Sequence, residues 1–176
     1  MTRFRDASPA DTAALAALGR ATFIETFGHL YDPEDLAAFL PTHSEEAWRE
    51  QLESPDFAVR VAEDGRALVG YAKLGPKSLP YETAAPALEL RQIYVLKPWH
   101  GAGIAQALME WVLAEARRRG AHELYLSVYV DNHRARRFYE RYGFRFAAPY
   151  KFMVGKQADE DQIFRLVLEE APCPSK

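Results

Sequence analysis

Residues 88–111, LELRQIYVLKPWHGAGIAQALMEW, give the clearest indication of the fold. The first nine residues are rich in β-branched and aromatic side chains, which predicts a half-buried strand that ends before Pro98. Gly101 and Gly103 then permit a sharp backbone turn. The apolar residues that follow recur at helical spacing: Ile104, Leu108, Trp111 and Val112.

A glycine turn that enters a helix leaves several backbone N–H groups without partners and pointing in one direction. Together with the helix dipole they form a site for an anion, most naturally a phosphate. The alternative is that Gly101 and Gly103 only close a tight turn. Neither the Walker spacing with its Gly-Lys-Ser/Thr end nor the third glycine of a dinucleotide fingerprint is present, which argues against both of those nucleotide sites.

Residues 124–144, LYLSVYVDNHRARRFYERYGF, repeat the order of strand, cap and helix. Asn132 lies where a helix cap is expected, and Asn is a favoured capping residue. Three aromatic residues, Phe138, Tyr139 and Tyr142, fall within the predicted helix.

These two blocks resemble the GNAT superfamily of acyl-CoA-dependent N-acyltransferases. His100-Gly101-Ala102-Gly103-Ile104-Ala105 is similar to the family's pyrophosphate loop, except that the family prefers Arg or Gln where His100 stands. A neutral imidazole donates one hydrogen bond without a fixed charge, so CoA affinity is expected to be weaker or more dependent on pH. The later family signature is matched at Asn132, Ala135, Phe138, Tyr139, Gly143 and Phe144.

The resemblance covers roughly residues 2–170 and implies a single-domain α/β GNAT fold with a short tail at 171–176. Its sheet is mixed and mostly antiparallel, twisted, with about six or seven strands flanked by helices. The predicted order of elements agrees with this fold. We expect a strand at 2–6, helices opening at Ser8, Asp32 and Ser44, a hairpin of 57–63 with 68–74, a mobile loop at 75–86, the two blocks above, and closing strands at 144–152 and 162–168.

The resemblance also implies transfer of an acetyl group from acetyl-CoA to an amine by direct attack in a ternary complex. The backbone of Ile93, Tyr94 and Val95 is then expected to pair with the pantetheine amides, and the loop from His100 to Ala105 to hold the pyrophosphate. Asn132 is expected to bind the pantetheine arm, although a helix cap explains it equally well. Lys97, Arg134 and Arg137 are candidates for the 3′-phosphate or adenine side of the cofactor, although a solvated charged face is the more common explanation for any one of them.

A primary amine has a pKa near about 10.4, so it is mostly protonated at neutral pH and a base must remove a proton. Glu89, in the strand where many family members carry a glutamate, is the first candidate, with Glu25 or a water chain as rivals. By strand alternation Glu89 and Gln92 are expected on opposite faces. Tyr139 is expected to protonate the departing thiolate, and its alternative is a packed aromatic residue.

The segment 23–36 is similar to bacterial GNAT members described as spermidine or spermine acetyltransferases. A polyamine is therefore the lead for the acceptor, with Glu25, Phe27, Tyr31 and Gln92 as its expected contacts. Two other interpretations stay open. One is a protein or peptide acetyltransferase, for which the loop 75–86 either roofs the site or leaves it open. The other is a non-catalytic acyl-CoA-binding module.

The composition fits one domain, because 176 residues can bury a substantial core and 48% of them are hydrophobic. A formal charge of −3 gives no general attraction to nucleic acid. The single cysteine, Cys173, excludes an internal disulfide and is expected to be an exposed thiol without a catalytic role. The five histidines show no metal-ligand spacing. We expect a cytoplasmic protein with no membrane segment, either a monomer or a homodimer.

Overall fold

The computed structural model describes residues 1–168, so Cys173 and the predicted tail lie outside the described part. Seven strands form one mixed sheet in the order β1-β2-β3-β4-β5-β7-β6, and the pair β4–β5 is its only parallel one within residues 1–168. The strands are β1 (Arg3–Asp6), β2 (Ala58–Asp64), β3 (Ala67–Pro76), β4 (Ala87–Val95), β5 (Glu123–Tyr129), β6 (Arg145–Val154) and β7 (Gln157–Val167). The predicted α/β class and the mostly antiparallel sheet are confirmed.

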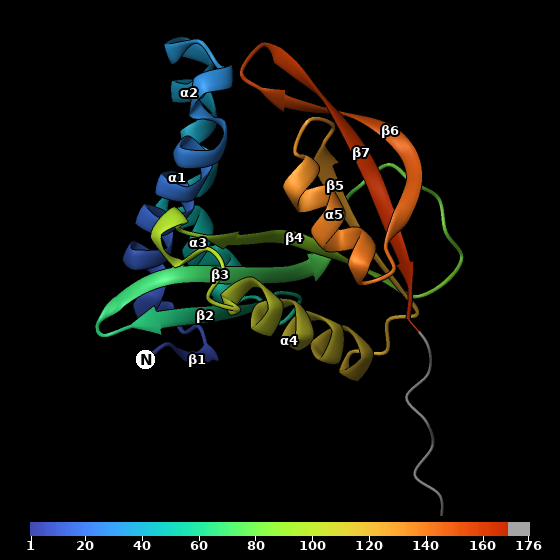
Figure 1. Ribbon diagram of the computed structural model, residues 1–176, viewed down its shortest axis with the longest axis horizontal. Helices are drawn as coiled ribbons and strands as arrows, with labels where there is room; N and C mark the ends of the chain where they lie inside the picture. The colour runs from blue at the N-terminus through green and yellow to red at the C-terminus, as the bar shows by residue number, and fades with distance from the viewer. Residues whose placement is uncertain (169–176) are drawn as a thin grey trace, which may run out of the picture.

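Helices cover both faces of this sheet (Figure 1). They are α1 (Thr12–Phe27), α2 (Pro33–Phe39), α3 (Glu45–Glu53), α4 (Ile104–Arg118) and α5 (His133–Arg141), with short 3-10 turns at Pro9–Asp11, Gly28–Leu30, Leu40–His43 and Lys97–Trp99. None of the helices in the described part is long and apolar enough to cross a membrane.

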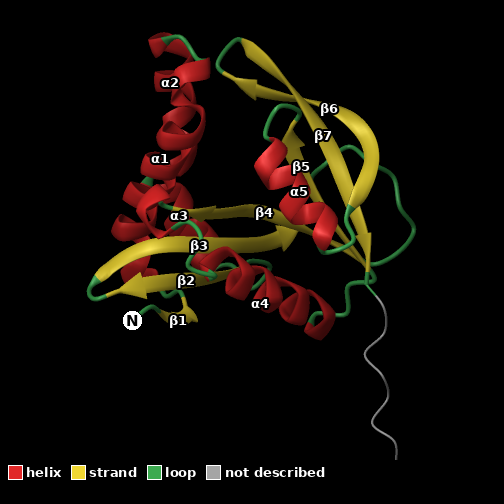
Figure 2. Cartoon of the chain, in the orientation of Figure 1, coloured by secondary structure: helices red, strands yellow, loops and turns green. Residues whose placement is uncertain are grey.

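The two faces have separate cores. On one face Leu15 of α1 and Trp48 of α3 pack against Val61 and Tyr71 of the hairpin β2–β3. On the other face the apolar side chains of α4 pack against the sheet, in a cluster that includes Leu126 of β5 and Phe164 of β7. Figure 2 shows α4 and α5 in front of the strands. Each face of the sheet is therefore covered by its own set of helices.

The closing hairpin is longer than predicted. β7 begins at Gln157 rather than at residue 162, and Gly155, with φ +58°, forms the turn that joins it to β6. The sequence of the early part of β7, Gln-Ala-Asp-Glu-Asp, has low strand propensity, so the sequence pattern did not indicate a strand there. The register of pairing with β5 places Asp161 opposite Tyr129.

The predicted mobile loop at 75–86 is tied to the sheet. The carboxylate of Glu89 accepts hydrogen bonds from the backbone N–H groups of Ser78 (2.7 Å) and Leu79 (3.2 Å). Thr83 donates to Glu123 Oε2 at 2.7 Å, and the ring of Tyr81 packs against Tyr125.

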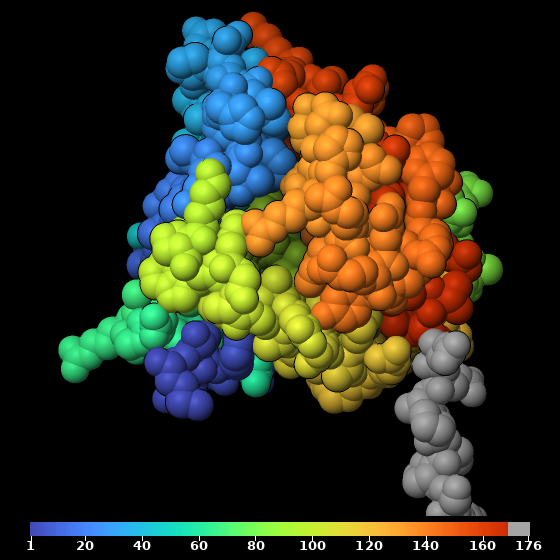
Figure 3. All heavy atoms as spheres, viewed as in Figure 1, coloured from blue at the N-terminus to red at the C-terminus, as the bar shows by residue number. Residues whose placement is uncertain are grey.

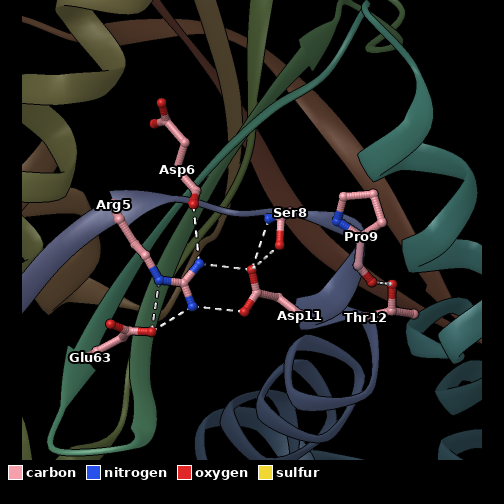
Figure 4. Close-up of polar contacts among 7 residues, drawn as sticks. All are labelled: Arg5, Asp6, Ser8, Pro9, Asp11, Thr12 and Glu63. Atoms are coloured by element: carbon pink, nitrogen blue, oxygen red, sulfur yellow. Dashed lines mark hydrogen bonds and ion pairs between the residues drawn. The ribbon is translucent and has the colours of Figure 1, made fainter.

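A charged cluster fixes the entry into α1 (Figure 4). Ser8 and Asp11 form a capping box, as the predicted helix start at Ser8 requires. The guanidinium of Arg5 donates to both carboxylate oxygens of Asp11, at 2.8 and 2.7 Å, and its Nε donates to Glu63 at 2.8 Å. The hydrogen bond from Arg5 lowers the pKa of Asp11 to about 2. The cluster thus joins β1, the first helix and β2.

We expect Asp11→Asn to lower the free energy of unfolding at pH 7 by about 2 kcal/mol, because it removes a charged acceptor from a paired, buried position. The loss should be full above the ordinary pKa of 3.8 and should vanish as the pH falls through about 2, where the wild-type carboxylate also becomes neutral. Urea unfolding at several pH values measures this. Asp6→Asn is the control, since Asp6 is exposed and its pair with Arg60 lies at the surface. Equal losses in the two variants would contradict the account.

Candidate active site

A cleft opens in the middle of the sheet because β4 and β5 separate. Their parallel pairing covers three residue pairs only, from Ala87–Glu123 to Glu89–Tyr125. Beyond that point Leu90–Val95 and the end of β5 form two walls of a cleft with a volume of about 770 Å³. Figure 3 shows the surface hollowed between the yellow-green atoms around residue 100 and the orange atoms of α5. The edge of β4 that faces this cleft carries backbone groups that a bound chain can pair with.

A β-bulge lies in β4 at the start of the cleft. Lys73 of β3 pairs with Gln92 and the next residue, Leu74, pairs with Leu90, so Arg91 is the extra residue. The bulge alters the alternation of the strand. Glu89 pairs with Gly75 and Gln92 with Lys73, so the two side chains lie on the same face of the sheet. The expectation of opposite faces is wrong because it assumed a regular strand.

The glycine turn after β4 forms the other end of the cleft. Gly101 and Gly103 have φ +83° and +78°, and both are exposed with open space where a side chain would begin. Gly103 is the residue that caps α4, and no side chain caps this helix. The N–H groups of the first helical turn therefore have no partner within the helix. They lie at the positive end of the helix dipole, which suits a phosphate group.

His100 links this turn to its surroundings. Its Nε2 lies 2.7 Å from the carbonyl oxygen of Val95, and a carbonyl only accepts, so Nε2 carries the proton. Its Nδ1 accepts a hydrogen bond from the guanidinium of Arg134 on α5. His100 thus spans the mouth of the cleft between the turn and α5 in its neutral form, and it occupies one of the backbone acceptors of β4.

A model of the acetyltransferase (GNAT) family matches residues 23–144. The chain belongs to this family. It is similar to an uncharacterised N-acetyltransferase of Mycobacterium tuberculosis, with 33% identity over 154 residues, 87% of this chain and 95% of the relative. The PaiA N-acetyltransferase of Thermoplasma acidophilum, solved with coenzyme A, superposes with a TM-score of 0.76 at 19% identity, covering 95% of this chain and 99% of that one.

A ribosomal-protein-alanine N-acetyltransferase of Brucella melitensis superposes with a TM-score of 0.72 at 26% identity, covering 94% of this chain and 99% of that one. The protein is thus an acyltransferase enzyme of the GNAT type with the GNAT fold. The chain has three features that suit the family's donor, acetyl-CoA: a cleft of about 770 Å³, a β4 strand edge that faces it and a glycine turn suited to phosphate.

Tyr139 of α5 lines the cleft from the side of α4 and α5. Its ring also packs edge-on against Phe144, with ring centroids 5.9 Å apart. Tyr139 is therefore both a packed aromatic residue and a residue that lines the cleft. Burial, and next the neighbouring Tyr94, raise the pKa of the Tyr139 phenol well above its usual range. The phenol therefore holds its proton at neutral pH, as a proton donor must.

Asn132 also lines the cleft, and it caps α5 with its own side chain. Its Oδ1 accepts a hydrogen bond from the N–H of Ala135 at 3.3 Å. The amide NH₂ is left for another partner, so the capping role and a contact with the pantetheine arm are compatible.

Glu89 lies outside the cleft. It is buried, and its carboxylate is held by the loop at Ser78 and Leu79 and by an ion pair with Arg91 at 3.4 Å. A carboxylate with these partners stabilises the loop. This placement favours a structural role for Glu89, and its expected role as the base stays a prediction. The loop itself is also absent from the lining of the cleft, so it does not roof the site.

All four expected acceptor contacts line the cleft, at different places. Phe27 and Tyr31 lie at the end of the cleft nearest α2, where the ring of Phe27 meets Tyr129 edge-on. Glu25 lies at the mouth and accepts a hydrogen bond from the N–H of Lys97 at 3.0 Å. Gln92 lines the cleft and accepts a hydrogen bond from the buried Tyr71 hydroxyl at 3.1 Å.

Two carboxylates of β7 line the cleft and were missed by the sequence reasoning: Asp159 and Asp161. Both are buried, and their register with β5 and β6 places them on the face of α1 and α2, beside Tyr129 and Phe152. Asp159 accepts hydrogen bonds from the Tyr31 hydroxyl and from Gln157 Nε2. The only signal in the sequence was the alternation Asp-x-Asp, and this pattern is equally typical of a strand whose charged side chains face solvent.

We expect His100→Arg to tighten CoA binding about three- to tenfold, because a fixed cation replaces a neutral imidazole beside the expected pyrophosphate position. Calorimetric titration with CoA measures this. His122→Arg, which adds the same charge at an exposed position away from the cleft, is the matched control. Equal changes in both variants would show a general effect of charge, and weaker binding by His100→Arg would show that the imidazole itself is required.

Proposed function

We propose that this enzyme acetylates a primary amine of a small cationic molecule, with a polyamine as the leading candidate, by direct attack on acetyl-CoA in a ternary complex. The observation that carries the proposal is the closure of the acceptor end of the cleft. The turn of the hairpin β6–β7 lies against α2 (Figure 1), where Lys156 N–H donates to Asp35 Oδ1 at 2.8 Å. Gly155 in this turn has no space for a side chain against Asp35.

Next to this contact, an apolar cluster joins the helices to β6. Val154 is fully buried and packs with Phe23 and Tyr31, and Phe39 and Phe152 are among the residues packed against this cluster. The hydrogen bond from Tyr31 to Asp159 joins the helical side to β7 below the cluster. An extended peptide needs a continuous open groove, whereas this arrangement encloses the end of the cleft. A small acceptor fits it better.

The lining of this end favours a cation. Phe27 and Tyr129 supply aromatic faces and edges, and Asp159 and Asp161 supply carboxylates. Aromatic rings and buried carboxylates together attract organic ammonium groups. Glu25 at the mouth is the proposed contact for a second positive charge on a longer amine such as spermidine.

On the donor side we propose that the cleft-facing backbone of Ile93–Val95 pairs with the pantetheine amides, although the Val95 carbonyl is already engaged by His100. The turn from Gly101 to Ala105 holds the pyrophosphate, with Arg134 and Arg137 at the rim. Tyr139 gives a proton to the departing thiolate. These roles place the donor on the α4 and α5 side and the acceptor on the α1 and α2 side of the opening between β4 and β5.

The direct test is an assay of CoA release from acetyl-CoA with a panel of spermidine, spermine, aminoglycosides, amino acids and short peptides. We expect small polycationic amines to give the highest kcat/KM. Preference for peptides would support protein acetylation instead. No release with any amine, while acetyl-CoA still raises the melting temperature, would support the acyl-CoA-binding module.

A further inference from the structure

We infer that Asp161 accepts the proton from the acceptor ammonium and that Asp159, held by Tyr31, positions that ammonium. This inference rests on the proposed function. It assigns to Asp161 the role of general base, for which Glu89 was the first candidate. Asp161 stands on β7 opposite Tyr129, at the point where the end of β5 borders the cleft. It is thus on the acceptor side of the opening, while Tyr139 is on the donor side.

Among residues 1–168, Asp161 differs from the other buried carboxylates in the partners that its side chain has. Asp11, Glu89 and Glu123 each form an ion pair with an arginine: Arg5, Arg91 and Arg165 respectively. Asp159 has hydrogen bonds from Tyr31 and Gln157. Within residues 1–168 Asp161 has no ion-pair partner, although it is only 9% exposed, and the Ser127 hydroxyl is the group that stabilises its charge. Its position in the cleft leaves the carboxylate available to a cation that arrives there.

Among residues 1–168, the titratable groups that interact electrostatically with Asp161 include Asp159, Tyr31, Tyr94, Tyr129 and Tyr150, all of them acids. Burial, and next the negative charge of Asp159, raise the pKa of Asp161 to about 7. A carboxylate with this proton affinity is half ionised at neutral pH and is a much stronger base than an ordinary aspartate.

The proton balance is complete with the groups present. Asp161 takes one proton from R–NH₃⁺, and the nitrogen lone pair then forms the C–N bond with the thioester carbonyl. The C–S bond breaks and Tyr139 protonates the thiolate. Of the two protons then on the positively charged nitrogen, one passes to the phenolate of Tyr139 and the other stays on the product amide. Asp161 returns its proton to solvent. The products are the acetylated amine, CoA and one released proton.

The test compares Asp161→Asn, Asp159→Asn and the control Glu160→Gln, with spermidine as the probe amine or, if spermidine is inactive, the most active amine of the panel. Glu160 neighbours both aspartates but is exposed and pairs with Lys151. We expect Asp161→Asn to lower kcat about 10²- to 10³-fold at pH 7, with unchanged affinity for acetyl-CoA. Its rate should then rise about tenfold per pH unit up to pH 9, following the free amine.

The pH profile separates proton transfer from a structural role. The wild-type rate should fall below about pH 7, where Asp161 becomes protonated, and level off above it. This break near pH 7 should be missing in Asp161→Asn, whose rate rises evenly through pH 7. Asp161→Glu should restore the break and part of the rate. Asp159→Asn should raise KM for the amine and move the break to lower pH, because it removes a neighbouring negative charge.

Retention of the break near pH 7 in Asp161→Asn, or a loss of rate no larger than that of Glu160→Gln, would overturn this inference and leave the proposed function intact. Failure of the wild type to acetylate any amine of the panel would overturn the proposed function and the inference with it. Calorimetry with acetyl-CoA shows in each variant that the donor site is folded.

Discussion

Replacing Gly103 with glutamate is expected to weaken CoA binding at least 100-fold, which is about 3 kcal/mol or more. Two effects act together. The residue has φ +78°, which a side chain tolerates poorly, and the new carboxylate would lie at the helix start where the pyrophosphate is expected. Like charges at this site cost binding free energy, and the bulk of the side chain hinders close approach of the phosphates to the backbone. Calorimetric titration with CoA gives the dissociation constant.

Gly65→Glu is the matched control for this experiment. Gly65 also has positive φ (+64°) and open space around it, but it lies in the turn of the hairpin β2–β3, away from the lining of the cleft. Both variants should lose about 1–2 kcal/mol of stability from backbone strain, and only Gly103→Glu should lose CoA. Tight CoA binding by folded Gly103→Glu would exclude the turn as the pyrophosphate site.

Replacing Tyr139 with phenylalanine is expected to lower kcat about 10²- to 10³-fold while leaving the affinity for CoA within about twofold, because only the hydroxyl is removed. The ring and its contact with Phe144 remain, so folding should be preserved. Steady-state rates with the most active amine, and calorimetry with CoA, measure the two quantities separately.

Tyr142→Phe is the control at the C-terminal end of the same helix, since Tyr142 caps α5, packs against the core and does not line the cleft. It should keep nearly full activity. If Tyr139→Phe also retains full activity, the thiolate is protonated by another group, such as water. A parallel fall in CoA affinity would instead assign the hydroxyl to binding.

The sequence predicted those parts of the molecule that depend on local signals. The strand, glycine turn and helix of residues 88–111 follow from side-chain pattern and from the conformations that Gly101 and Gly103 permit. Asn132 could be predicted as a cap because capping is decided within one helical turn. The hairpin at Asp64–Gly65 is likewise local, and so the order of elements was predictable along most of the chain.

The acceptor side could not be predicted in this way because it depends on long-range register. The bulge at Arg91 is visible only when β3 and β4 are paired, and it invalidates simple alternation between Glu89 and Gln92. Asp159 and Asp161 enter the cleft only because β7 pairs with β5 beyond the point where β4 has separated. No local pattern distinguishes these aspartates from solvent-exposed residues of a strand.

The most direct measurement is mass spectrometry of a small amine after incubation with the enzyme and isotope-labelled acetyl-CoA, beside a reaction with a short peptide. We expect the label on a primary amine of the small polycation, in stoichiometric amount with released CoA, and far slower labelling of the peptide. Label found preferentially on the peptide, or CoA released with no labelled amine, would contradict this expectation.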